Sequence, residues 1–218
     1  MQLLGILGGA FDPIHFGHLR MAQELADALS LAEVRFIPTA SPPHRPQSST
    51  PAADRLAMVD LAIDGNPLFR GDDLEIRRHA EQRQPSYTID TLLSLEQELG
   101  KDTALCLLMG GDAFLGLPAW HRWETLLQHC HIVVANRPNA VLQPAKLSQP
   151  LKALWEKSGT HNVRDIAKEK AGRIFMQPIT ALDISATRIR KDLKLGKSPR
   201  YLLPDAVIDY ISTHTLYR

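Results

Sequence analysis

The segment from Gly8 to His18, which reads GGAFDPIHFGH, most constrains how this chain can fold. It follows the apolar run Leu3–Leu7, which predicts a strand buried on both faces, and it precedes a helix expected to begin near His18. Adjacent glycines let the backbone approach a ligand closely, and a helix N-terminus offers N–H groups with a partial positive charge. Imidazoles at the same place can donate hydrogen bonds to phosphate oxygens. The segment therefore predicts a nucleotide phosphate site between a strand and a helix.

Strands and helices alternate along the chain. Apolar runs predict strands at 3–7, 34–37, 68–76, 105–109, 132–135 and 174–176. Helical periodicity, with its start and stop signals, predicts helices at 19–29, 51–63, 86–99, 123–128, 147–157, 185–195 and 204–211. This order favours an α/β fold: a Rossmann-like, doubly wound, mostly parallel sheet with helices on both faces and a small C-terminal helical part. We expect a single domain over 1–218, with the core at 1–180 and the helical segment at 181–218.

Ligands of such sheets bind beyond the carboxyl ends of the strands. Three segments follow predicted strands at those ends, namely 8–18, the proline-rich loop that starts at 39, and 110–112. We therefore expect them to converge on one crevice.

Composition excludes several classes of protein. The 218 residues carry a net charge of +1, which gives no electrostatic case for binding nucleic acid or a membrane surface in general. No run approaches the roughly 18 apolar residues that a membrane span requires. The apolar start of the chain lacks a basic region and is expected to be a strand, not a signal peptide. Cys106 and Cys130 both lie in apolar runs and are expected to be reduced core thiols in a cytoplasmic protein.

The histidine pair His15 and His18 allows three interpretations. Their spacing places them side by side on the opening turn of a helix, where they could be phosphate donors or simple polar caps. They could also be half of a zinc site completed by His131, which would require further ligands. The glycines around the pair favour phosphate binding.

A second polar segment, Asp183 to Lys191, reads DISATRIRK. Its hydroxyl residues Ser185 and Thr187 are typical of a helix N-terminus. We expect three basic residues in the first turn, where positive charge opposes the helix dipole unless an anion is bound: Arg188, Arg190 and Lys191. The alternatives are a bound polyphosphate and a solvated basic face.

Four further places in the chain each have a structural and a functional interpretation. Asp112 could cap a short helix at 113–117 or accept a ribose hydroxyl. Trp120 could pack or stack on a flat ligand, and the hydroxyls at 86–88 could cap a helix or receive a carboxylate. His44 and Arg45 lie in a proline-stiffened loop and could be merely exposed or could contact a ligand.

Taken together, these motifs resemble a known family. GGAFDPIHFGH resembles the GxFDPxHxGH signature of the nucleotidyltransferase superfamily, and ISATRIR resembles its ISxTxxR partner. The segments SPPHRP, PSYT, GGDAF and PAWHRW are similar to those of bacterial nicotinate mononucleotide adenylyltransferases, as is the closing YLLPDAVIDYISTHTLYR. The resemblance covers essentially the whole chain.

The resemblance implies transfer of AMP from ATP to nicotinate mononucleotide, which gives nicotinate adenine dinucleotide (deamido-NAD) and pyrophosphate. Magnesium (Mg2+) would accompany ATP, with no dedicated protein metal site. Catalytic roles would fall on His15, His18 and Arg190. The implied ATP-binding residues are Gly8, Gly9, Ala10, Phe11, His15, His18, Gly110, Asp112, Ser185, Thr187 and Arg190. The implied mononucleotide-binding residues are His44, Arg45, Tyr87, Thr88, Trp120 and His121.

The chain departs from the family pattern at Ala10, where relatives commonly carry Thr or Ser, which leaves only a backbone N–H for the phosphates. It also has Thr39-Ala40-Ser41 where relatives often carry Asn. The alternatives are a related nucleotidyltransferase for nicotinamide mononucleotide or phosphopantetheine, and a non-catalytic nucleotide-binding protein. We expect a monomer or a weak homo-oligomer with no nucleic-acid or membrane partner.

Overall fold

The computed structural model describes residues 1–41, 50–136, 142–180 and 182–218. Within these ranges seven strands form one sheet in the order β3-β2-β1-β4-β5-β7-β6, and every neighbouring pair is parallel. The strands are β1 (Gln2–Gly9), β2 (Glu33–Pro38), β3 (Phe69–Gly71), β4 (Thr103–Gly110), β5 (His131–Asn136), β6 (Gly159–Thr160) and β7 (Ile174–Pro178). The predicted Rossmann-like α/β architecture is confirmed, with a sheet that is wholly parallel in the described part of the chain.

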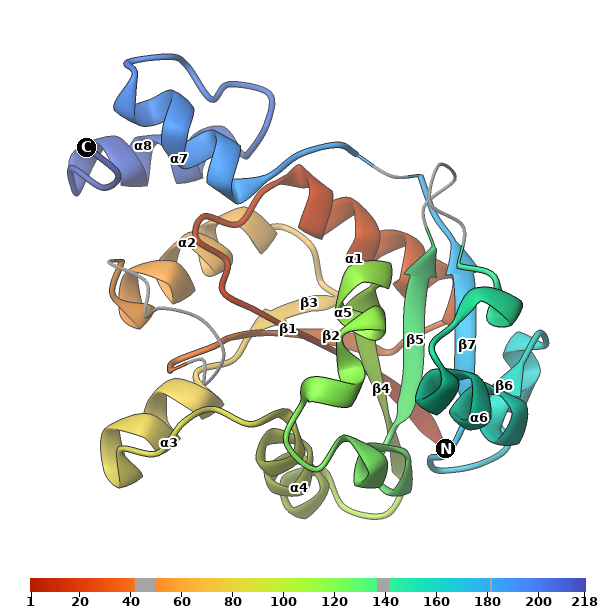
Figure 1. Ribbon diagram of the computed structural model, residues 1–218. Helices are drawn as coiled ribbons and strands as arrows, with labels where there is room; N and C mark the ends of the chain where they lie inside the picture. The colour runs from red at the N-terminus through yellow and green to blue at the C-terminus, as the bar shows by residue number, and fades with distance from the viewer. Residues whose placement is uncertain (42–49, 137–141, 181) are drawn as a thin grey trace.

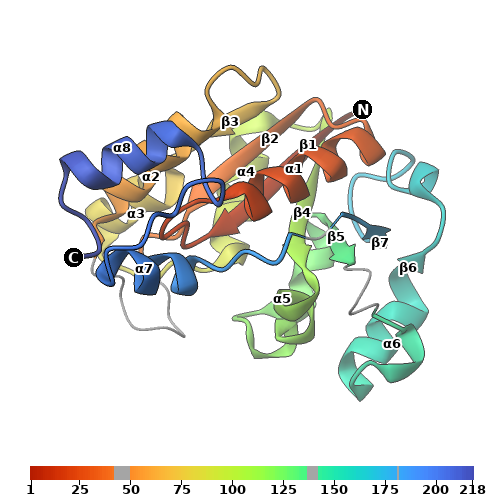
Figure 2. The same ribbon diagram turned by 90° about the horizontal axis from the view of Figure 1, so that it is seen from above.

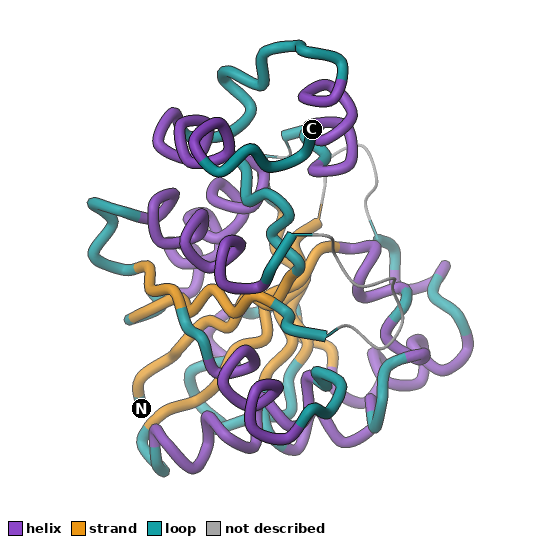
Figure 3. The backbone as a smooth tube through the Cα atoms, turned by 90° about the vertical axis from the view of Figure 1, so that its left-hand side faces the viewer, coloured by secondary structure: helices purple, strands orange, loops and turns teal. Residues whose placement is uncertain are grey.

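Helices cover both faces of this sheet (Figure 1; Figure 3). They are α1 (Phe16–Leu29), α2 (Ala52–Ile63), α3 (Leu74–Gln82), α4 (Thr88–Leu99), α5 (Gly111–Leu115), α6 (Gln149–Ser158), α7 (Ala186–Lys194) and α8 (Asp205–Thr213). Buried residues of α1, α2, α7 and α8 join one apolar cluster, and those of α4, α5 and α6 join the other. None of the helices in the described ranges is long and apolar enough to cross a membrane.

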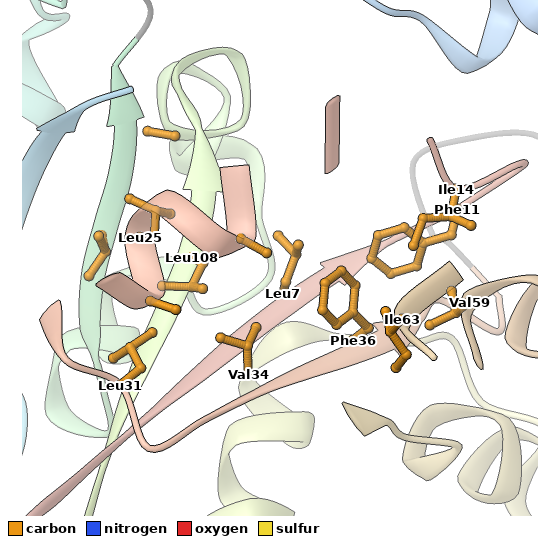
Figure 4. Packing of buried hydrophobic residues seen from close by; sticks show 14 of the residues in the cluster. Leu7, Phe11, Ile14, Leu25, Leu31, Val34, Phe36, Val59, Ile63 and Leu108 are labelled. Atoms are coloured by element: carbon orange, nitrogen blue, oxygen red, sulfur yellow. The ribbon is translucent and has the colours of Figure 1, made fainter. Parts of the chain in front are cut away.

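There are two clusters because successive side chains along a strand point to opposite faces of the sheet. In β4, Ala104, Cys106 and Leu108 join one cluster, whereas Leu105, Leu107 and Met109 join the other. Figure 4 shows the first cluster, where Leu7 and Phe36 pack between strands and helices. Each fully buried large apolar side chain stabilises the fold by about 1.5–3 kcal/mol.

Both cysteines are buried free thiols, as expected, and burial raises the pKa of Cys106 to about 12.

The segment 68–76 differs from the sequence prediction, which extended a strand region through it. The strand β3 ends at Gly71, and α3 begins at Leu74. Asp72 makes this turn because its Oδ1 accepts a hydrogen bond from the N–H of Leu74 (2.9 Å) while its Oδ2 accepts one from Arg35 (3.0 Å). The predicted helix at 147–157 corresponds to α6, and the short strand β6, which the sequence did not predict, follows it directly. The predicted helix at 123–128 is a 3₁₀ helix, Trp123–Gln128.

The sheet has a topological switch point between β1 and β4, which are neighbours in the sheet although far apart in sequence. After β1 the chain enters α1 on one face, and after β4 it enters α5 on the other. Ligand crevices form at such points, outside the carboxyl ends of the strands. The C-terminal helices α7 and α8 lie beside α1 and α2 on the first face (Figure 2). The hydroxyl of Tyr210 in α8 donates to Asp54 in α2 (2.8 Å).

Candidate active site

The turn between β1 and α1 is held by a buried aromatic ring. Phe11 is 2% exposed and has a φ of 47°, in the left-handed region that residues with side chains seldom adopt. Its ring centroid lies 5.2 Å from the His18 ring and 5.9 Å from the Phe36 ring. A Cβ at Gly9 would lie 3.3 Å from the Phe11 ring, so glycine at that position allows the ring to pack under the backbone. The packing of Phe11 against His18 and Phe36 therefore holds the turn in place at the carboxyl end of β1.

His15 and His18 lie at the start of α1, as their spacing predicted. The helix begins at Phe16, which makes His15 the N-cap and places His18 in the first turn. Their rings stack with centroids 3.7 Å apart, and the backbone N–H of His15 donates to Nδ1 of His18 (3.3 Å). An Nδ1 that accepts leaves the proton of a neutral imidazole on Nε2, so His18 presents an N–H donor there.

Both histidines are neutral at physiological pH. Burial lowers the pKa of His15 to about 4, and burial together with the neighbouring His15 lowers the pKa of His18 to about 3. A neutral imidazole can donate one hydrogen bond and carries no charge of its own. The pair is thus suited to donate to phosphate oxygens.

These shifts predict that the ligand-free protein loses stability below about pH 6.5. The folded-state pKa values lie below the unfolded value of 6.5, so the unfolded state takes up protons first as the pH falls. Each of the two histidines then contributes a loss of about 2 kcal/mol by pH 5. Urea unfolding at pH 7.5 and pH 5 measures this loss, and His18→Gln, which cannot titrate, is expected to lose less of its stability. An equal loss in the variant and the wild type would contradict the prediction.

Arg190 of α7 joins the second motif to the first. Its Nη1 donates to the backbone carbonyl of Asp12 (2.6 Å), and its Nη2 donates to the hydroxyl of Thr187 (3.4 Å). Ser185 is the N-cap of α7, and its side chain makes no cap hydrogen bond. The segments 8–18 and 183–191, which we expected to bind the same phosphates, are therefore in direct contact, although they come from opposite ends of the chain.

The prediction that three basic residues occupy the first turn of this helix is wrong. Because α7 begins at Ala186, only Arg188 lies in that turn. Arg188 is exposed and its Nε lies 3.9 Å from Oδ2 of Asp192. Arg190, two residues further along, is in the second turn, and Lys191 lies in the last turn. The helix-dipole argument thus applies to a single residue. The case for phosphate binding depends instead on the contact of Arg190 with the turn after β1.

Asp112 follows the end of β4, opposite β1 at the switch point. The helix α5 begins at Gly111, two residues earlier than the predicted 113–117, and its N-cap is Gly110. Asp112 therefore lies inside the first turn and does not cap the helix. Its side chain is exposed at the carboxyl end of the sheet, where a ribose hydroxyl could reach it.

Three of the residues expected to bind the second substrate, Tyr87, Thr88 and His121, lie around the start of α4. This helix begins at Thr88, with Tyr87 as its N-cap. The Tyr87 ring contacts the His121 ring, with centroids 4.3 Å apart and planes inclined by 33°. Trp120 precedes His121 at the end of a short 3₁₀ helix and packs, half-buried, against the second apolar cluster. The structure brings Tyr87 and His121 together.

The loop that carries His44 and Arg45 lies outside the described residues, but its boundary is visible. Ser41 and Ser86 are joined by two hydrogen bonds, from Ser86 N to Ser41 O (2.9 Å) and from Ser41 N to Ser86 Oγ (3.3 Å). This places the start of that loop beside the start of α4.

His131 cannot complete a zinc site with the histidine pair. It is the first residue of β5 and so lies at the amino ends of the parallel strands, whereas the histidine pair follows the carboxyl end of β1. Its Nε2 contacts the carbonyl of Glu169 (2.8 Å), and its Nδ1 accepts from the N–H of Arg173 (3.2 Å). Within the part of the chain that the structure describes, no group of three or more His, Cys, Asp or Glu residues could hold a metal ion.

The sequence did not predict a role at the site for Arg55 or Tyr217. Arg55 lies in α2. It is 2% exposed and donates to three backbone carbonyls, those of Ala10 (2.6 Å), Thr39 (2.7 Å) and Thr50 (3.3 Å). It thereby joins the turn after β1 to the chain that follows β2. One signal was present in the sequence: Arg55 shares a helix face with the buried Met58, where an apolar residue is expected.

The second is Tyr217, next to the C-terminal residue. Its hydroxyl donates to Oδ1 of Asp12 (2.6 Å), so a third segment of the chain contacts the turn after β1. No local pattern in the sequence marks this tyrosine, because its partner lies at the other end of the chain.

The comparisons with known proteins agree with this geometry. The profile of the family described as cytidylyltransferase-like matches residues 6–192. A relative from Pseudomonas fluorescens is 48% identical over 217 residues, covering 99% of this chain and 97% of its own length. One from Pseudomonas putida strain GB-1 is 49% identical over 219 residues, covering 100% and 96%. Both are named "Probable nicotinate-nucleotide adenylyltransferase".

Solved structures show the same fold. The nicotinic acid mononucleotide adenylyltransferase of Plasmodium falciparum complexed with NaAD superposes with a TM-score of 0.73 at 18% identity, covering 100% of this chain and 98% of its own. Full-length similarity, the paired phosphate motifs and the shared fold lead to one conclusion. This chain is a nucleotidyltransferase that belongs to the cytidylyltransferase-like family and, within it, to the nicotinate-nucleotide adenylyltransferases.

Proposed function

We propose that this protein transfers the adenylyl group of ATP to nicotinate mononucleotide, which yields nicotinate adenine dinucleotide and pyrophosphate in NAD biosynthesis. The observation that carries the proposal is the contact of Arg190 with the turn that holds His15 and His18. It gathers donors from both phosphate motifs at the carboxyl end of β1. The names of the full-length relatives specify the nucleotides.

The reaction needs no general base from the protein. The nucleophile is the 5′-phosphate of the mononucleotide, whose second pKa is about 6, so it is largely deprotonated at neutral pH. Histidines with pKa values near 3 and 4 do not compete for that proton. The protein has instead to align two polyanions and stabilise the charge that moves onto pyrophosphate.

The donors at the site fit this task. We assign Nε2–H of His18 to the α-phosphate, where the bond to pyrophosphate breaks, and His15 and Arg190 to the departing pyrophosphate. The backbone of Gly8 to Phe11, with Gly110, Asp112, Ser185 and Thr187, would hold the rest of ATP. Removing one such preorganised donor typically lowers kcat by about 10²–10³-fold.

Mg2+ fits the site as a partner of ATP. The described residues provide hydrogen-bond donors at the turn but no cluster of three potential ligands, so the ion would be held by phosphate oxygens and water, as Mg2+ prefers. When bound it would screen the negative charge of the phosphates.

The pyridine ring is assigned to the region between α4 and Trp120. Trp120 would stack on the ring, while Thr88 and the backbone at His121 would bind its carboxylate at the N-terminus of α4. A carboxylate gains more from a helix N-terminus than a carboxamide does, which favours the nicotinate form. His44 and Arg45 are assigned to the same substrate from the sequence resemblance.

Trp120→Ala is expected to raise KM for nicotinate mononucleotide about tenfold, because stacking on an aromatic side chain contributes about 1–3 kcal/mol. KM for ATP should change less than twofold, since Trp120 lies in the segment assigned to the other substrate. Steady-state kinetics with each substrate varied in turn measures both values. A larger rise for ATP than for the mononucleotide would refute the assignment.

Pyrophosphate release tests the function itself. Purified protein is incubated with ATP, Mg2+ and one acceptor: nicotinate mononucleotide, nicotinamide mononucleotide or phosphopantetheine. We expect release chiefly with the first. Equal rates with the two mononucleotides would remove the nicotinate preference, and ATP binding without release from any acceptor would indicate a non-catalytic nucleotide-binding protein.

We further propose that the protein acts in the cytoplasm as a monomer or weak homo-oligomer. Sedimentation at several protein concentrations tests the oligomeric state.

A further inference from the structure

Tyr217 lies buried against the phosphate-binding turn. It is 9% exposed, and its hydroxyl donates to Oδ1 of Asp12 over 2.6 Å. The chain after α8 is held in place by backbone hydrogen bonds from Leu216 to Ile211 (3.0 Å) and from Thr215 to Ser212 (3.2 Å). The tyrosine is thus presented to Asp12 by an ordered segment.

Asp12 is shared between Tyr217 and Arg190. The backbone carbonyl of Asp12 accepts from Nη1 of Arg190 at 2.6 Å, whereas its carboxylate Oδ2 lies 3.7 Å from the same nitrogen. A charge-assisted hydrogen bond between these groups would be about 2.7–2.9 Å long. The guanidinium is therefore oriented mainly by a neutral carbonyl and by Thr187, and it is not locked into a close pair with the carboxylate.

The hydroxyl of Tyr217 is a stable donor to Asp12. Burial and the adjacent Asp12 carboxylate both raise the pKa of Tyr217, so the phenol keeps its proton at physiological pH. The bond occupies Oδ1 and is one of the contacts that hold the carboxylate. Removing the hydroxyl weakens that hold, and a shift of Oδ2 from its present 3.7 Å toward Nη1 of Arg190 would form the close pair that these two groups favour.

We propose that Tyr217 is a positioning residue for adenylyl transfer: by holding Asp12, it keeps the guanidinium of Arg190 available to the pyrophosphate group. This inference rests on the proposed function for its catalytic consequence but not for its binding consequence. A guanidinium paired closely with a carboxylate would have less positive charge to offer a polyanion.

The variant Tyr217→Phe tests this, because it removes the hydroxyl and keeps the ring. We expect the affinity for inorganic pyrophosphate, measured by calorimetry on the free protein, to fall about tenfold. We expect kcat to fall by a similar factor, with KM for nicotinate mononucleotide changed less than twofold. Tyr210→Phe is the matched control, since it removes another tyrosine–aspartate bond of the C-terminal segment (2.8 Å to Asp54) that has no contact with Arg190. It should leave pyrophosphate binding unchanged.

A double-mutant cycle separates positioning from general stability. With Asp12→Asn there is no carboxylate to neutralise Arg190, so adding Tyr217→Phe should weaken pyrophosphate binding less than twofold. Wild-type affinity in Tyr217→Phe, an equal loss in Tyr210→Phe, or a full tenfold loss in the Asp12→Asn background would each overturn the proposal. If the wild type binds pyrophosphate but shows no adenylyl transfer, the function fails while the binding cycle still decides the role of Tyr217.

Discussion

Replacing His18 with alanine is expected to lower kcat about 100- to 1,000-fold while KM for ATP and for nicotinate mononucleotide changes less than threefold. The side chain presents Nε2–H in a fixed tautomer, because its Nδ1 already accepts from the backbone of His15. A donor aimed at the charge that develops in the transition state affects kcat far more than substrate binding. Steady-state pyrophosphate release gives both constants.

His18→Gln is the matched control for this experiment. Its side-chain amide retains an N–H donor of similar reach but lacks the ring that contacts Phe11 and His15. We expect it to recover part of the lost kcat. An unchanged kcat in His18→Ala would remove His18 from the transition state, and a loss confined to KM would make it a ground-state binding residue.

The substitution Arg55→Met is expected to lower the free energy of unfolding by about 3–5 kcal/mol. The variant removes a buried guanidinium and leaves the carbonyls of Ala10 and Thr39 without this donor. Both hydrogen bonds are partly buried, and a hydrogen bond to a charged group contributes about 1.5–3 kcal/mol. Urea unfolding, analysed by linear extrapolation, measures the change.

Arg70→Met controls for the general loss of a positive charge, since Arg70 is exposed at the edge strand β3. Its effect should stay within about 0.5 kcal/mol. Arg55→Lys, which keeps the charge but has a single nitrogen, should fall between the two, because one ammonium cannot reach carbonyls on both sides. A loss below about 1 kcal/mol in Arg55→Met would show that water replaces the guanidinium at these carbonyls.

The sequence was sufficient to predict the sheet and the position of the histidine pair at the start of the first helix. Runs such as 105–109 are apolar at every position, which is typical of strands covered on both faces, and this strand is confirmed within β4. The turn at 8–18 combines glycines with a helix start, and its chemistry is local, so spacing alone placed His15 and His18 correctly. Parallel topology then brought 110–112 to the same edge of the sheet.

Local patterns failed where tertiary contacts set the boundaries of an element. At 72–76, the pairing of Asp72 with Arg35 ends the strand and starts α3, and that partner is distant in sequence. In α7, the N-cap at Ser185 moves Arg190 out of the first turn, so the residue is important for its contact with Asp12 and not for the helix dipole.

Arg55 and Tyr217 could not be assigned from sequence because their partners lie far along the chain. The acceptor groups of Arg55 are main-chain carbonyls, which leave no mark in a sequence. Tyr217 contacts Asp12 in a fold where α8 packs beside α2. Such contacts depend on the finished fold.

The bond from Tyr217 to Asp12 also has a practical consequence for handling the protein. Because Tyr217 is bonded to Asp12, an affinity tag or fusion partner attached directly after Arg218 would lie close to the turn after β1. A bulky or strongly acidic extension there would compete with the docking of the tyrosine. Tags are better placed before Met1, because the amino end of β1 lies at the opposite end of that strand from the turn.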